Sequence, residues 1–172
     1  MTPTKTLVIS GLAVALVYIA AMFINIRVPV PGSGGMIHLG DLPLFVFALI
    51  YGRKIGGLAG ALGLTLFDLT AGWTLWAPFT FVIAGAVGWT VGAFAESNRH
   101  YRLSVYCASV AIANLITISG YYIVEGILYG NWIAPAGSIP VNFLQVTIAA
   151  IIAYPIAKRL KNSVFTRSDT HI

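Results

Sequence analysis

The residues of this chain that could do chemistry are mostly carboxylates, amides and aromatic rings. Asp41, Asp68 and Glu125 are three of its five acidic residues. Asn142 and Gln145 stand three positions apart at the start of an apolar run, so on a helix they share one face. Carboxylates and amides accept hydrogen bonds from N–H groups, and aromatic rings stack on flat rings. This combination favours the binding of a small polar heterocycle.

Aromatic and imidazole side chains stand near these groups in the sequence. GWTLWAP contains two tryptophans, YGNWIAPAGSIP contains Trp132, and IHLGD contains a histidine. Tryptophans in such segments most often form a belt at a membrane interface, and they also form a slot for a flat ring when acids and amides lie beside them. The expected substrate-binding residues are His38, Asp41, Trp73, Trp76, Glu125, Asn142 and Gln145.

Most of these candidates also have an ordinary structural interpretation. Asp41, before LP, can cap the helix that begins there, and Asp68 can face lipid headgroups near a helix end. Asn142 and Gln145 can serve as hydrogen bonds between helices. Glu125 differs, because YYIVEGILYG places it inside an apolar helix, where an ionisable residue indicates function.

No pattern in the sequence indicates catalysis. HExxH, CxxC, P-loop and GxSxG motifs are absent. The single cysteine, Cys107, excludes an internal disulfide and a cysteine-based metal site. We therefore expect no catalytic residue, no metal and no cofactor.

The elements that must position these groups are membrane helices. Hydrophobic residues make up 58% of the chain, charged residues 9%, and the mean hydropathy is +0.88. These values are too apolar for an ordinary soluble domain. The pI near 9.6 would suit a nucleic-acid partner, but the cations are spread over several turns and act as topology signals. We expect a lipid bilayer as the surroundings and no nucleic acid.

The apolar runs predict an all-α bundle of six transmembrane helices in a single domain, residues 1–172. The expected helices cover residues 6–26, 42–52, 55–71, 76–95, 103–128 and 141–157. Prolines and glycines in VPVPGSGGMIHLGD forbid helix between the first two. The second helix is too short to span alone unless protein shelters its ends.

Nine of the ten basic residues fall at one end of this predicted bundle. They are Lys5, Arg53, Lys54, Arg99, Arg102, Lys158, Arg159, Lys161 and Arg167. Short loops rich in Lys and Arg stay in the cytoplasm, so both termini are predicted to be cytoplasmic. The acids discussed above then lie in the outer half, and the inner half is aliphatic. A self-sufficient channel or pump would need ionisable groups along its whole path, so this pattern disfavours one.

Small residues indicate where helices approach one another closely. Two GxxxG pairs, at 56/60 and 88/92, predict packing within the bundle. Gly11 and Ala15 form a further pair on the first helix. This pair either packs within the bundle as well or forms a smooth face on which a second membrane protein docks, and the first helix is the best candidate for such a face.

The segment IHLGDLPLFVFALIYGRKIGGLAGALGLTLFDL, residues 37–69, resembles the substrate-binding S component of energy-coupling factor (ECF) vitamin transporters. A helix-breaking loop, GDLP, a short helix, a basic turn, a glycine-rich helix and a terminal acid follow in the order typical of that family. The chain length and the six predicted helices agree with it. The resemblance thus covers the architecture of the whole chain, and the quoted segment is its most specific part.

The resemblance implies a function that spacing alone does not show. Such a subunit lies in the prokaryotic plasma membrane, binds a vitamin from outside and associates with a membrane T subunit and two ATP-binding subunits. The family's docking motif maps here onto Gly11 and Ala15. Transport is expected to involve toppling of the subunit in the membrane, with ATP hydrolysed by the partners.

The outer end favours a small neutral or amine-bearing heterocycle, because three carboxylates stand there against only Arg27 and His38. Hydroxymethylpyrimidine and a B6 vitamer are the leading candidates, and riboflavin, thiamine and pantothenate are alternatives. Two other classes remain open: a membrane-embedded enzyme that depends on Glu125 or Asp68, and an assembly subunit without a ligand.

Overall fold

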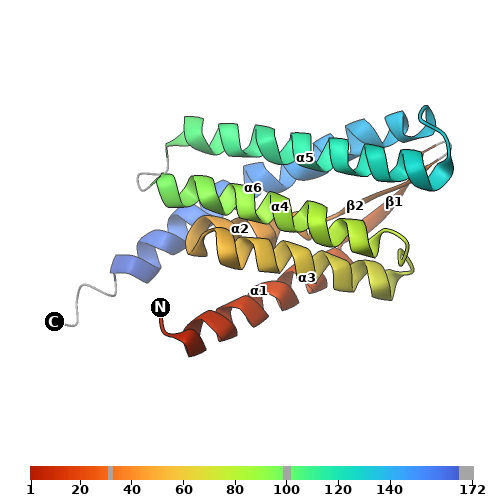
Figure 1. Cartoon of the computed structure of the whole chain (residues 1–172). Coiled ribbons are helices and arrows are strands. Elements are labelled where there is room, and N and C mark those ends of the chain that lie inside the picture. The colour runs from red at the N-terminus through yellow and green to blue at the C-terminus, as the bar shows by residue number, and fades with distance from the viewer. Residues whose placement is uncertain (31–32, 99–101, 167–172) are drawn as a thin grey trace.

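A computed structural model describes residues 1–30, 33–98 and 102–166, and it is mostly helical (Figure 1). In these residues the chain forms six α-helices, one 3-10 helix and a two-stranded sheet. In chain order they are α1 (Pro3–Phe23), β1 (Asn25–Val30), β2 (Ser33–His38), α2 (Asp41–Tyr51), α3 (Arg53–Ala71), α4 (Ala77–Ser97), α5 (Leu103–Tyr129), η1 (Ala134–Ser138) and α6 (Ile139–Thr166).

The helices lie roughly side by side and divide the molecule into two ends. Helix α1 begins and the described part of α6 ends at one end of the bundle, which we call the termini end, and β1 and β2 lie at the other, the hairpin end (Figure 1). The basic turn between α2 and α3 and the basic part of α6 belong to the termini end. Arg99 and Arg167 fall outside the described residues.

Four stretches of the described chain are long and apolar enough to cross a membrane, and they contain α1, α4, α5 and α6. Helix α2 is apolar but shorter, with 11 residues. About 20 residues are needed to cross the hydrocarbon core at 1.5 Å per residue. A count of six crossings and a cytoplasmic position for both termini therefore stay predictions.

The segment after α1 is a regular β-hairpin, whereas the sequence indicated only irregular loop. The strands pair antiparallel, with Asn25 opposite His38. Helix α1 ends at Phe23, earlier than the expected residue 26, because the Asn25 amide donates to the carbonyls of Ala21 and Met22, at 3.0 and 2.8 Å. These bonds use carbonyl groups that a helix end leaves unpaired.

The start of α1 and the end of α6 also differ from the sequence expectation. Helix α1 begins at Pro3, after Thr2, whose hydroxyl accepts from the Lys5 N–H at 3.4 Å. Helix α6 does not end at residue 157; it continues through Pro155 to Thr166. The short piece before it, expected as loop, is the 3-10 helix η1.

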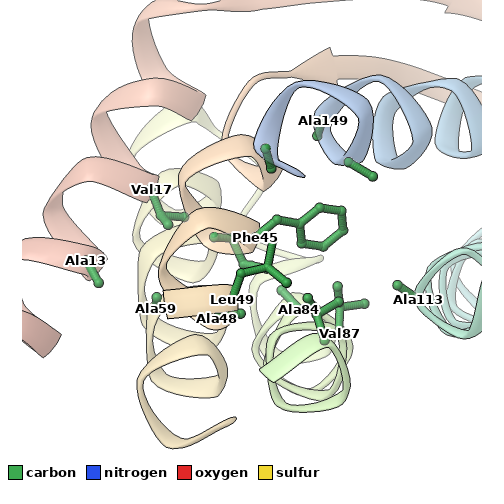
Figure 2. Close-up of a cluster of buried hydrophobic side chains, with 14 of the residues drawn as sticks. Ala13, Val17, Phe45, Ala48, Leu49, Ala59, Ala84, Val87, Ala113 and Ala149 are labelled. Atoms are coloured by element: carbon green, nitrogen blue, oxygen red, sulfur yellow. The ribbon is translucent and has the colours of Figure 1, made fainter. Parts of the chain in front are cut away.

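Helices α3 and α4 pack through their glycines, as the two GxxxG pairs predicted. A Cβ added at Gly56 would lie 2.6 Å from the Gly88 carbonyl oxygen, and one added at Gly60 would collide with the Ala84 carbonyl oxygen of α4. Close backbone approach of this kind supplies the van der Waals contacts that hold helices together in lipid. The core around Phe45 and Leu49 of α2 is otherwise rich in alanine and valine (Figure 2).

A polar contact fixes the turn that joins α2 to α3. Gly52 has φ +86°, a conformation that favours glycine, and the next N–H, of Arg53, donates to Glu96 Oε1 at 3.0 Å. The Arg53 guanidinium also pairs with Glu96 at 3.2 Å and lies over the Trp89 ring. A carboxylate from α4 thus takes the place of a local cap at the start of α3.

Candidate functional site

A cavity opens at the hairpin end, with about 730 Å³ of empty space including its mouth. Its walls come from β2, α2, α3, α4, α5 and α6. All seven residues that the sequence singled out for substrate binding line it: His38, Asp41, Trp73, Trp76, Glu125, Asn142 and Gln145. Residues more than a hundred positions apart are therefore brought to one place.

Gln145 of α6 connects two of the other candidates. Its amide nitrogen donates to Asp41 Oδ2 at 2.7 Å, and its amide oxygen accepts from the backbone N–H of His38 at 2.9 Å. The capping interpretation of Asp41 is wrong: Gly40 is the N-cap of α2, and no side chain caps it. Asp41 is the first helical residue, and its carboxylate is turned to α6.

Glu125 of α5 has a partner of its own. The Ser138 hydroxyl lies 2.8 Å from Glu125 Oε2 and 2.8 Å from the Pro135 carbonyl oxygen. Glu125 and Ser138 are both buried. This contact fixes η1 against α5 near the hairpin end and closes one side of the cavity.

Two tryptophans form the aromatic part of the wall. The Trp73 and Trp76 rings meet edge to face, with centroids 5.2 Å apart, and Tyr129 extends the cluster. Trp132 does not join them, contrary to the idea of a slot made of three tryptophans: it is exposed, lies over Gly126 and is not in the cavity lining. Rings at such angles present both faces and edges to a flat ligand.

The cavity has many hydrogen-bond acceptors. Among the described residues that line it there is no lysine or arginine. Arg27 lies outside the lining, with its guanidinium 5.8 Å from the Trp73 ring centroid. The site therefore offers no guanidinium or ammonium group to clamp an anion.

His38 occupies an enclosed position at the end of β2. Its ring meets Phe67 edge to face at 5.4 Å, and its Nδ1 is buried without a hydrogen-bond partner. Burial lowers the pKa of the imidazole, and the Asp41 carboxylate offsets part of this effect. The neutral ring can both donate and accept one hydrogen bond.

Several lining residues were not among the seven expected to bind substrate. Thr80 and Tyr121 face each other across α4 and α5, with their oxygens 3.1 Å apart, and Asp68 lies on the α3 side. One signal could have found part of this set: Thr117, Tyr121 and Glu125 repeat every four residues, so they share a face of α5.

The docking candidates lie far from the cavity. Gly11 and Ala15 are exposed on α1, and a Cβ added at Gly11 would meet no atom within 4 Å. This face of α1 is therefore not used in the packing of the bundle, unlike the glycine pairs of α3 and α4.

The comparison that decides the family is a match of residues 1–162 to the family model described as the ECF-type riboflavin transporter, S component. The chain belongs to this family. As an S component it is a subunit of a membrane transporter and not an enzyme, and subunits of this kind bind a small molecule and associate with T and ATPase subunits.

Individual relatives agree with this assignment. The chain is 29% identical over 126 residues to the thiamine precursor transporter HmpT of Lactococcus lactis subsp. cremoris, covering 73% of this chain and 70% of that protein. It is 32% identical over 114 residues to an uncharacterized protein of Pyrococcus woesei, covering 66% and 72%.

A solved structure supports the fold. The S component matches a chain described under "Structure and mechanism of the S component of a bacterial ECF transporter" with a TM-score of 0.72 at 20% identity. The match covers 95% of this chain and 99% of that one. The S-component fold is thus shown over nearly the whole length.

Proposed function

We propose that this S component captures a thiamine precursor, hydroxymethylpyrimidine, from outside the cell and delivers it as part of an ATP-driven importer. The observation that carries the proposal is the lining of the cavity: three carboxylates, two tryptophans and two side-chain amides, with no basic residue but His38 among its described members. The similarity to a thiamine precursor transporter supports the same substrate.

The ligand's chemistry matches this lining. Hydroxymethylpyrimidine is a small flat ring with an amino group, ring nitrogens and a hydroxyl group. The rings of Trp73 and Trp76 supply apolar faces and edges for it. Carboxylates and amide oxygens accept from its amino and hydroxyl groups, and the amide of Asn142 can donate to a ring nitrogen.

Riboflavin is the second candidate, because the matching family carries its name. Its pyrimidinedione ring, however, presents two carbonyl oxygens, which need donors where this cavity offers mainly acceptors. A B6 vitamer and thiamine satisfy the acceptors better, whereas pantothenate lacks a cationic partner for its carboxylate.

We propose six crossings in the prokaryotic plasma membrane, with the termini end in the cytoplasm and the cavity open to the outside. The positions of Lys5, Lys54 and Arg102 at the termini end support this orientation. Toppling of the whole subunit would carry the ligand across, since the part of the bundle nearer the termini offers no charged path for it.

The substrate assignment is tested on the protein purified gently in mild detergent without partner subunits. Mass spectrometry of the molecule released on denaturation is expected to find hydroxymethylpyrimidine, and titration calorimetry of the emptied protein is expected to show tight binding of it. Recovery of riboflavin, with no heat on addition of hydroxymethylpyrimidine, would replace this substrate by the second candidate.

The T subunit and two ATP-binding subunits are the proposed partners, and the Gly11 and Ala15 face is the proposed contact with the T subunit. Ala15→Trp is expected to leave ligand affinity unchanged and to abolish uptake by cells that express the whole transporter. Ala15→Ser, which keeps the residue small, is the matched control. Equal loss of binding and uptake in Ala15→Trp would contradict the docking assignment.

A further inference from the structure

The three carboxylates of the cavity differ in what their oxygens contact. Asp41 accepts from Gln145, and Glu125 accepts from Ser138. Asp68 is buried, with 6% of its surface exposed, and its Oδ2 has no hydrogen-bond partner. In the described part of the chain, Oδ2 of Asp68 is the one buried carboxylate oxygen without a hydrogen-bond partner.

The surroundings of Asp68 contain hydroxyl groups but no cation. The Thr80 side chain is close enough to interact with the carboxylate, and Thr80 in turn is 3.1 Å from the Tyr121 hydroxyl. No lysine or arginine is among the described residues of the lining. The two hydroxyl protons can therefore be directed along Tyr121, Thr80 and Asp68, which leaves Oδ2 without a donor.

A buried acceptor without a donor destabilises the empty protein, and the cost disappears if a ligand brings the donor. A carboxylate accepts hydrogen bonds and does not donate them when ionised, so it distinguishes N–H groups from carbonyl groups. The unpartnered Nδ1 of His38 makes no such distinction, because in a neutral imidazole this nitrogen can be either a donor or an acceptor, depending on the tautomer. Of these two unpartnered buried atoms, only the oxygen of Asp68 can therefore select for an amine.

We propose that Asp68 is the specificity-determining residue of this cavity, accepting a hydrogen bond from the amino group of an aminopyrimidine and so selecting amine-bearing rings. This inference rests on the proposed function and adds the atom, Oδ2 of Asp68, that would recognise the amino group of the ligand. Asp41 and Glu125, whose carboxylates already have side-chain donors, hold the walls in place.

The test compares two ligands on two proteins by titration calorimetry. The probes are hydroxymethylpyrimidine and the analogue in which hydrogen replaces the amino group; the proteins are the wild type and Asp68→Asn. The wild type is expected to prefer the amino ligand about 10- to 100-fold, as for a hydrogen bond to a charged group. In Asp68→Asn the preference should fall toward onefold while the affinity for the analogue stays unchanged.

Glu96→Gln is the matched control, since it makes the same carboxylate-to-amide change at the termini end, where Glu96 pairs with Arg53. It should keep the full preference for the amino ligand. Should Asp68→Asn fail to fold, the wild type is titrated with the dimethylamino analogue, which has no N–H. This ligand is expected to bind at least tenfold more weakly than the parent, and equal binding would overturn the inference.

The remaining outcomes distinguish the role of Asp68 from the proposed function. If Asp68→Asn weakens both ligands equally, or if the wild type binds both equally, Asp68 does not read the amino group, although the proposed function stands. If the wild type binds neither probe, the proposed substrate itself is wrong, and the role of Asp68 falls with it.

Discussion

Helix α3 passes through two regions of opposite character. Near the termini end its glycines touch the backbone of α4, and Gly56 and Gly60 have no space for a side chain. Near the hairpin end the same helix presents Asp68 to a cavity with an unpartnered oxygen. The first region is close-packed, and the second is open and contains polar side-chain atoms without hydrogen-bond partners.

This contrast suggests how a bundle with few polar groups can bind a polar molecule. Tight glycine contacts give α3 and α4 a fixed relative position without polar side chains. Unsatisfied groups, which cost free energy, are then gathered at one end where a ligand can relieve that cost. Stability and binding should therefore respond to changes in different halves of the same helices.

The largest effect is expected at the packed half. In Gly60→Leu the new side chain has to displace Leu44 and the Ala84 backbone, so unfolding in detergent should become easier by about 3 kcal/mol or more. Thermal unfolding followed by circular dichroism measures this change.

Gly11→Leu is the control for that variant, because Gly11 faces open space. It should unfold like the wild type. Equal destabilisation of both variants would show that the loss does not come from contact between α3 and α4, and helix propensity could not explain it either, because leucine favours helix more than glycine does.

A smaller effect on stability, joined to an effect on binding, is expected for Gln145→Leu. This change leaves the buried Asp41 carboxylate without its donor and frees the backbone N–H of His38. We expect a loss of about 1–3 kcal/mol in the free energy of unfolding, together with weaker binding of hydroxymethylpyrimidine.

Asn142→Leu is the companion variant, since Asn142 is half-buried on the same face of α6. Its unfolding should change less, because no buried carboxylate loses a partner. If Asn142→Leu proves more destabilising than Gln145→Leu, the link through Gln145 is not what holds the hairpin end together.

The smallest effect concerns pH. Burial lowers the pKa of His38 from its usual 6.5, so below pH 6.5 the unfolded chain takes up a proton that the folded chain refuses. Stability should therefore fall as the pH drops below 6.5, with a slope of at most about 1.4 kcal/mol per pH unit from this group. Melting temperatures between pH 8 and 5 measure the slope. His38→Gln should reduce it, and an unchanged slope would contradict the prediction.

The sequence predicted the helices well where apolar runs were long, and poorly where side chains decide the ends. Nothing in the apolar pattern reveals that Asn25 stops α1 by bonding to the carbonyls of Ala21 and Met22. The hairpin was hidden because Pro29 and the glycines of the segment suggested only a loop. The expected sixth helix ended at residue 157, yet α6 continues to Thr166.

The lining of the cavity was predicted more fully than its internal contacts. Seven residues were grouped correctly around one cavity because charge and hydropathy placed them at the same end. Their partners depend on tertiary contacts: Asp41 looks like a cap in the sequence, and only the position of α6 shows that it meets Gln145. Asp68 was not placed among the expected substrate-binding residues for the same reason.

The two hydrogen bonds of Gln145 span 107 and 104 positions of the chain. A ribosome making this protein releases His38 and Asp41 long before the residue that joins them, and domains form in the order of synthesis. The cavity is thus completed only after α6 has been synthesised and packed. A nascent chain stalled before α6 should be inserted in the membrane but unable to bind the ligand. Ligand binding by the nascent protein would therefore show that its synthesis is complete.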